Sequence, residues 1–205
     1  MAYYKVDEAS LTAVADAIRG RAGTTEPMQF PNGFTSAITE LPDFNAIIDR
    51  TITEIKSDTV TVIGRSAFNS CSNLTTVSFP NATKVEGTAF QNCIALVNVN
   101  LPKMASTANN AFQDCAFAIF DAENYYYIAG STFQRCANLR AFVLRVNRVA
   151  TLVSTNAFTG TPIESGDGYI YVPSSLVDSY KAATNWSTFA NQIRAIEDYP
   201  DITGG

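Results

Sequence analysis

Apolar residues recur along the middle of the chain at a fixed spacing. Each of the four cysteines follows a phenylalanine by three positions, and they lie 22, 22 and 21 residues apart: Cys71, Cys93, Cys115 and Cys136. A constant period between 20 and 50 residues is typical of a solenoid, in which each repeat is one supersecondary unit stacked on the next. The spacing therefore predicts a solenoid whose turns each contain one phenylalanine–cysteine pair.

The rest of each repeat predicts how its turn is built. After Cys71, apolar residues stand three, six and eight positions later, at Leu74, Val77 and Phe79. The last two alternate with polar residues, as on a strand with one buried face. A β-branched residue, Ile63 in this copy, stands five positions before the phenylalanine. We therefore expect each turn to contain a strand, a loop, a second short apolar contact and a compact segment ending in phenylalanine.

Two copies depart from the period. After Cys115 the pattern is one residue short, so that Phe117 and Phe120 take inward places. After Cys136 the repeat holds three extra residues, and we expect residues 145–150 to bulge as a loop. Such irregular turns are where a repeat protein can carry features that its scaffold does not dictate.

The repeats extend beyond the cysteines, and other segments flank them. Asp49 and Thr161 stand at the cysteine place of the two outer turns. We count about five to six turns. This count predicts a solenoid domain at residues 46–173, an N-terminal helical attachment module at residues 1–45, and a C-terminal cap and tail at residues 174–205.

The first 45 residues carry two amphipathic patterns, at residues 7–20 and 30–41. Helices this short are not stable alone in water, so they must pack together, on the solenoid or on another protein. We predict a helical hairpin whose apolar side chains attach the chain to a larger particle. The candidate attachment face consists of Leu11, Val14, Ile18, Phe30, Phe34 and Ile38.

After residue 173 the pattern predicts a helical cap. An apolar helix face around Tyr180 is followed by Trp186 and Phe189. The open end of a solenoid must be covered, and these two aromatic side chains have the size to cover it. Residues 201–205 are expected to form a loose tail.

The composition and the first residues limit which partners and which location we expect. The net charge of −5 gives no reason to expect nucleic acid or an anionic membrane as partner. No apolar run approaches the roughly 20 residues of a membrane helix, so we expect no membrane insertion. Because the first residues lack the apolar stretch of a secretory signal, we expect synthesis in the cytoplasm without a signal peptide.

Residue types argue against catalysis. The four cysteines are expected to be buried free thiols, because a chain without a signal peptide does not suggest a disulfide framework and buried cysteine packs as a small hydrophobe. The protein contains no histidine, which excludes a Ser-His-Asp or Cys-His arrangement. The cysteine spacing is far from that of a zinc site. We predict no catalytic, metal-binding or cofactor-binding residue and no cofactor.

Two groups of residues are candidates for a recognition surface. Four of the 14 basic residues fall within 14 positions, and they suit an acidic partner or an anionic glycan, the alternative being a solvated face: Arg135, Arg140, Arg145 and Arg148. A run of three tyrosines suits protein or sugar recognition, the alternative being packing within the turn with one ring inward: Tyr125, Tyr126 and Tyr127.

The motifs resemble a known family. The pattern Phe-x-x-Cys-x-x-Leu-x-x-Val-x-Leu-Pro, with Ile-Gly-x-x-Ala-Phe, resembles the BspA-like (Treponema pallidum-type) leucine-rich repeats over about residues 49–173. The stretch Ile170–Trp186 is similar to the C-terminal cap common in that family. The stretch Leu11–Ile38 resembles a short N-terminal module of tailed-phage and prophage structural proteins.

The resemblance implies an α/β fold: a short leucine-rich-repeat solenoid with an N-terminal helical hairpin and a C-terminal helical cap. It implies recognition or adhesion without catalysis, and it transfers no defined binding residues. The leading interpretation is a phage virion structural protein, a tail, baseplate or fibre component that presents a recognition surface for host attachment. The alternatives are a head fibre or capsid decoration protein, and a bacterial cell-surface adhesin.

The same interpretation predicts partners. Other virion proteins would bind the N-terminal module, and a host cell-surface protein or glycan would bind the solenoid. Closed homo-oligomers are the usual route to many weak contacts on one particle, and a trimer suits a fibre.

Overall fold

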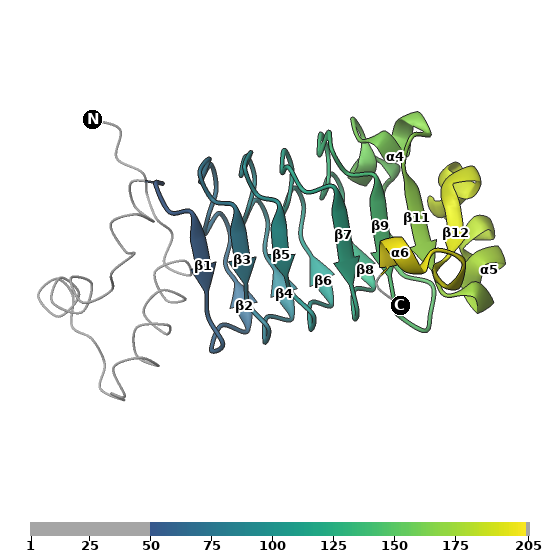
Figure 1. The fold of residues 1–205 in the computed structure, drawn as a ribbon, viewed down its shortest axis with the longest axis horizontal. Coiled ribbons are helices and arrows are strands. Elements are labelled where there is room, and N and C mark those ends of the chain that lie inside the picture. Colours follow the sequence, from purple (N-terminus) through teal and green to yellow (C-terminus); the bar gives the residue numbers. More distant parts are fainter. Residues whose placement is uncertain (1–49, 204–205) are drawn as a thin grey trace, which may run out of the picture.

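The computed structural model describes residues 50–203, which form a solenoid of stacked turns (Figure 1). The expected N-terminal hairpin, with its face from Leu11 to Ile38, lies outside the described residues, as does Asp49. Five successive turns each contribute two strands, and the next contributes one. The strands of these turns are β1 (Glu54–Lys56), β2 (Val62–Ile63), β3 (Thr76–Ser78), β4 (Lys84–Val85), β5 (Asn98–Asn100), β6 (Ser106–Thr107), β7 (Ile119–Ala122), β8 (Tyr127–Ile128), β9 (Ala141–Leu144), β10 (Thr151–Leu152) and β11 (Tyr169–Val172).

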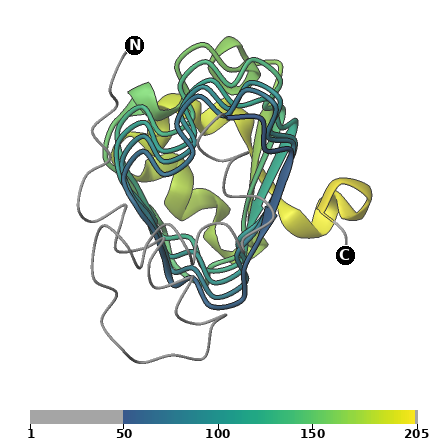
Figure 2. The ribbon, with the colours of Figure 1, turned by 90° about the vertical axis from the view of Figure 1, so that its left-hand side faces the viewer.

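The strands pair with the same strand of the neighbouring turn, always in parallel. The shorter strands form one sheet in the order β10-β8-β6-β4-β2, and the longer ones form the sheets β1-β3-β5 and β7-β9-β11-β12. Val77 is the register partner of both Ile55 and Val99. Seen along the axis, the turns lie over one another (Figure 2). The predicted repeat solenoid is therefore confirmed.

The irregular turn after Cys115 interrupts this order. Figure 1 shows the two sheets of longer strands in one row, but β5 and β7 belong to different sheets. Phe117 and Phe120 are buried, as the shifted pattern predicted. The turn is one residue shorter than its neighbours, so its side chains stay in the core while β7 pairs with β9 and not with β5.

Stacked phenylalanine rings fill the interior. Neighbouring ring centroids in this column lie between 5.2 and 5.9 Å apart, with ring planes within 11° of parallel: Phe68, Phe90, Phe112, Phe133 and Phe158. Each ring comes from the same position of its turn, so the rings of adjacent turns pack directly on one another. Aromatic pairs contribute about 0.5–1.5 kcal/mol beyond the area they bury.

The cysteines form a second interior column. All four are buried free thiols, as predicted. Cys93 Sγ lies 3.0 Å from the carbonyl oxygen of Phe68, one turn earlier, and Cys115 and Cys136 make the equivalent contacts with Phe90 and Phe112. The thiol thus supplies a donor to a carbonyl group inside the core, where an unpaired polar group is costly.

The compact segment of each turn depends on left-handed backbone. Pairs of residues four positions apart have φ between 55° and 61°: Ser66 and Ser70, Thr88 and Asn92, Asn110 and Asp114, Ser131 and Arg135. This conformation directs the N–H of Ser66 to the carbonyl of Gly87 at 3.0 Å, and that of Ser70 to Gln91 at 2.7 Å. The segment therefore bonds to the next turn without forming a strand.

The chain after β10 closes this end of the described solenoid. It contains η1 (Thr155–Phe158), α4 (Pro162–Ser165), η2 (Ser174–Leu176), α5 (Val177–Ala182), η3 (Trp186–Gln192), β12 (Ile193–Ala195), η4 (Ile196–Asp198) and α6 (Pro200–Thr203). Strand β12, which the sequence pattern did not predict, pairs with β11. Trp186 Nε1 donates to the carbonyl of Ala150 at 2.7 Å, and the Phe189 ring stands edge-on to Phe158 at 5.4 Å.

The expected loose tail is wrong for residues 201–203, which belong to α6. Just before it, Ile196 and Tyr199 pack on the outer face of the longer strands, against Val143 and Tyr171. This apolar contact holds the segment before α6 on the sheet, while α6 itself projects from the solenoid (Figure 2). No helix within residues 50–203 combines the length and apolar character needed to cross a bilayer.

We expect the left-handed positions to respond oppositely to two reciprocal substitutions. Thr88→Asn should raise the free energy of unfolding by less than about 1 kcal/mol, because asparagine adopts positive φ at lower cost than a β-branched residue, and the lost hydrogen bond between the Thr88 and Ser66 hydroxyls offsets part of the gain. Asn92→Thr should lower it by about 1 kcal/mol for the same reason. Urea unfolding followed by the fluorescence of Trp186, the single tryptophan, measures both. Effects of the same sign would contradict the backbone explanation.

Candidate recognition surface

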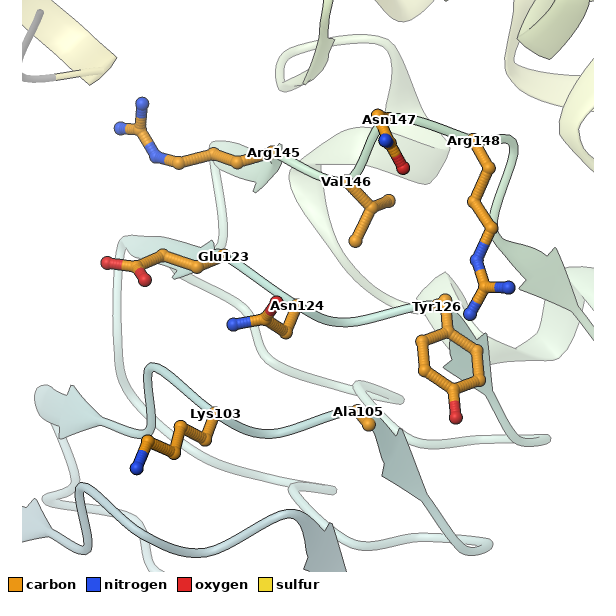
Figure 3. A pocket seen from close by; sticks show the side chains of 9 residues that line it. All are labelled: Lys103, Ala105, Glu123, Asn124, Tyr126, Arg145, Val146, Asn147 and Arg148. Atoms are coloured by element: carbon orange, nitrogen blue, oxygen red, sulfur yellow. The ribbon is translucent and has the colours of Figure 1, made fainter.

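A polar hollow of about 750 Å³ lies on the loops that join the longer to the shorter strands (Figure 3). Three successive loops build it, at residues 101–105, 123–126 and 145–150. Its lining residues are Lys103, Ala105, Glu123, Asn124, Tyr126, Arg145, Val146, Asn147 and Arg148. The hollow therefore spans three turns of the solenoid.

A difference in loop length creates the hollow. The loop between β7 and β8 has four residues, 123–126, whereas the loop between β9 and β10 has six, 145–150. Because the turns are stacked in register, the longer loop stands beyond its neighbour and forms a wall beside it. The predicted bulge at residues 145–150 is confirmed as a loop.

The wall is fixed from inside the molecule. Val146 is buried, which holds the middle of the loop against the core. The Tyr180 hydroxyl of α5 accepts a hydrogen bond from the Ala150 N–H at 2.9 Å and donates to the Arg148 carbonyl at 3.2 Å. The longer loop is thus anchored at both its middle and its end, and its side chains are held in place over the neighbouring loop.

Two of the four predicted arginines line the hollow. Arg145 makes a bidentate ion pair with Asp121, with Nε and NH2 at 2.9 and 2.7 Å from the carboxylate oxygens. Hydrogen bonding to Asp121 raises the pKa of the Arg145 guanidinium. Arg148 places its guanidinium carbon 4.0 Å from the centroid of the Tyr126 ring. One arginine is therefore matched to a carboxylate and the other is stacked on an aromatic ring.

The other two arginines lie elsewhere. Arg135 sits in the compact segment after Phe133, where it makes a bidentate ion pair with Asp114 at 2.6 and 2.7 Å. Arg140 is exposed just before β9 and does not line the hollow. The arginines that are close in sequence therefore form no single cluster, and a recognition role for Arg135 and Arg140 stays a prediction.

The tyrosine run divides between core and surface. Tyr125 is fully buried, with its hydroxyl 2.5 Å from that of Thr107, and burial raises its pKa. One ring inward was expected, and Tyr125 therefore belongs to the core and not to the candidate recognition surface. Tyr126 and Tyr127 are 39% and 43% exposed. Only Tyr126 lines the hollow.

Sequence reasoning missed several lining residues. Lys103, Asn124 and Asn147 stand in three different turns, and nothing in the repeat pattern marks them. Lys103 Nζ donates to the amide oxygen of Asn81 at 2.7 Å, a neutral partner. The spacing of 21 residues between Lys103 and Asn124 could have paired them, because a spacing of one period places residues side by side on adjacent turns.

The hollow is lined mainly by charged and polar residues. Its lining side chains carry three cations, Lys103, Arg145 and Arg148, and one anion, Glu123, in a protein with a net charge of −5. Two amides and a phenol add hydrogen-bonding groups of both kinds. Within residues 50–203, no three histidine, cysteine, aspartate or glutamate side chains gather in a way that could hold a metal ion.

The stacked parallel strands and the phenylalanine and cysteine columns define a repeat solenoid. Residues 61–192 match the BspA type leucine rich repeat region in six copies. The chain belongs to this family, and the expected resemblance of the repeats is confirmed. No curated protein sequence matches the chain.

Solved structures match parts of the chain at low identity. A leucine-rich repeat protein of Treponema pallidum is 20% identical with a TM-score of 0.48, and the match covers 59% of this chain and 58% of that one. The pneumococcal vaccine antigen PcpA is 13% identical with a TM-score of 0.49, covering 70% and 41%. This chain therefore spans between about two fifths and three fifths of the length of these proteins.

We expect the cysteines to resist thiol reagents in the folded protein. Burial raises the pKa of the Cys93 and Cys136 thiols to about 12, and reactivity requires the thiolate. A colorimetric disulfide reagent at pH 8 should find no reactive thiol in the native chain and four in urea. Because folding keeps these thiols protonated, the free energy of unfolding should fall as pH rises above about 9, the ordinary thiol value.

A thiol count below four in urea without reductant would reveal disulfides and contradict the free-thiol assignment. Rapid modification of the native chain would contradict the burial of the column.

Proposed function

We propose that this protein is a non-enzymatic recognition protein that attaches its carrier to a cell surface. The hollow carries the proposal: charged, amide and aromatic residues from three turns line one site. Membership of the BspA-type repeat family supports the same class of function, since the resemblance implies recognition or adhesion.

The rigidity of the scaffold supports this function. The Arg145–Asp121 ion pair and the Tyr180 hydroxyl hold the longer loop, and the core beneath it contains a column of stacked rings. Ordering side chains at an interface costs roughly 0.5–1.5 kcal/mol for each one immobilised. A surface whose side chains are already held loses less of its binding energy to ordering.

The C-terminal segment serves in this proposal as the cap of the solenoid. Support comes from Trp186 and Phe189, which are both buried against the last turn. Without a cover, the edge of β11 would offer unpaired backbone groups to another chain. Strand β12 occupies that edge. The cap would keep the protein from extending end to end through its C-terminal face.

The proposed carrier is a phage virion, with the chain as a tail, baseplate or fibre component. Support comes from the resemblance of residues 11–38 to a module of tailed-phage structural proteins. The N-terminal segment would bind other virion proteins, and the solenoid would face the host. Several copies on one particle, as in a trimer, would raise the overall affinity of a weak site through avidity.

A bacterial cell-surface adhesin is the second candidate. The BspA-type repeats favour it, because they cover most of the described chain and do not depend on the N-terminal resemblance. The two candidates share the recognition surface and differ in the carrier. They also differ in the cells that the surface should bind.

Binding to intact cells tests the recognition function. The fluorescently labelled full chain should bind saturably to bacterial cells of some strains in a panel, and excess unlabelled chain should displace it. Saturable binding to animal cells alone would favour the adhesin over the virion component. Absence of saturable binding to every cell type would overturn the recognition function itself.

The carrier is tested by particle assembly. Mass spectrometry of purified virions should detect the full chain, and deletion of residues 1–45 should abolish incorporation. Circular dichroism should show that the truncated chain keeps the strand signal of the solenoid. Incorporation of the truncated chain at the level of the full chain would refute the attachment role of the N-terminal module.

A further inference from the structure

We propose that the hollow binds an acidic sugar residue of a cell-surface glycan, with Arg148 holding the sugar's carboxylate. The inference rests on the proposed recognition function and adds the chemical class of the ligand. The site residues are Lys103, Glu123, Asn124, Tyr126, Asn147 and Arg148.

The charge of the hollow selects an anion at one end. Arg148 lies over the Tyr126 ring, and no carboxylate among residues 50–203 forms an ion pair with it. Stacking uses the face of the guanidinium, whereas its N–H donors point outward in the plane of the group. The edge of Arg148 can therefore make a charge-assisted hydrogen bond to a carboxylate while its face stays on Tyr126.

The opposite end suits hydroxyl groups. Figure 3 shows Glu123 and Lys103 on the far side of Asn124 from Arg148 and Tyr126. The Asn124 amide nitrogen donates to the Pro102 carbonyl at 2.8 Å, which orients its amide group. The Asn124 oxygen and the Glu123 carboxylate accept hydrogen bonds, and Lys103 donates them. A ligand with a carboxylate at one end and hydroxyls at the other matches this order.

The position of Glu123 also indicates where the carboxylate of the ligand lies. A second anion beside Glu123 would be repelled, so a ligand with negative charge spread along its length is disfavoured. An acidic sugar concentrates its charge in one group and carries neutral hydroxyls elsewhere. The hollow therefore favours a singly charged sugar residue over a run of acidic side chains.

The shape of the site favours a glycan over a peptide. Peptides commonly bind along a free sheet edge or in an apolar groove that takes a helix. The hollow is made of loops, and only Ala105 and Val146 among its lining residues are apolar. Its volume of about 750 Å³ lies within the ~300–1,000 Å³ typical of small-ligand sites. This is room for a short oligosaccharide.

An array of paired glycans tests the inference. Each acidic oligosaccharide is printed beside its carboxyl-reduced counterpart, which keeps the same stereochemistry and lacks the charge. The full chain should bind at least one acidic member, and reduction of the carboxyl group should weaken that binding at least tenfold. Equal binding to both members of every bound pair would overturn the inference.

Variants assign the binding to the hollow. Arg148→Ala should weaken binding to the acidic glycan at least tenfold, and Arg148→Lys should restore part of it, because lysine keeps the charge but not the stacked fork. Lys56→Ala, which removes an exposed cation on β1, is the matched control and should bind as the unchanged chain does. Thermal unfolding should be alike for all three variants, since both positions are exposed.

The remaining outcomes separate this inference from the proposed function. If Arg148→Ala leaves saturable cell binding unchanged, and carboxyl reduction leaves glycan binding unchanged, the glycan site is overturned and the recognition function stands. If a polyglutamate peptide binds and neither the acidic glycan nor its reduced counterpart competes with it, the hollow binds an acidic protein. This result would also overturn the glycan inference. Absence of cell binding by the unchanged chain would overturn the recognition function itself.

Discussion

The structure depends on hydrogen bonds that run along the solenoid axis from each turn to the next. Strands supply part of this ladder, and the compact segments supply the rest through residues with positive φ, such as Ser66 and Ser70. The N–H and C=O groups of every turn must lie opposite the complementary groups of the next turn. Backbone pairing therefore sets where the paired segments of each turn lie, and only the chain between them can vary in length.

Side-chain columns follow from that constraint. Residues one period apart lie side by side, so a residue that packs well against itself is favoured at each position. Phenylalanine rings stack on phenylalanine rings, and the amide of Asn69 donates to Gln91, which donates to Gln113. At the cysteine place of the last turn, Thr161 is also buried and also donates to a carbonyl, but to that of Phe158 in its own turn and not to the preceding turn.

The same constraint decides what the sequence could predict. Positions governed by the period, such as Val77 and Phe90, were predictable because their neighbours are a known number of residues away. The Arg135–Asp114 pair was predictable in the same way, because each residue stands one position before a cysteine of the repeat. The Arg145–Asp121 pair was not, because Arg145 begins the longer loop and lies 24 residues after Asp121, outside the period. Strand β12 escaped prediction for a related reason, since it lies outside the period and is defined by the free edge of β11.

In a strict repeat few positions can vary to build a binding site, and the hollow shows that the loops between strands are such positions. Strand and core positions cannot change without disturbing both neighbouring turns, whereas a loop between strands can lengthen if its ends keep their height. Residues 145–150 do this: Leu144 and Leu152 stay in the core while the chain between them rises beside the shorter loop. One local insertion thus converts an even surface into a site, which is lined by the longer loop itself and by the loops of the two preceding turns.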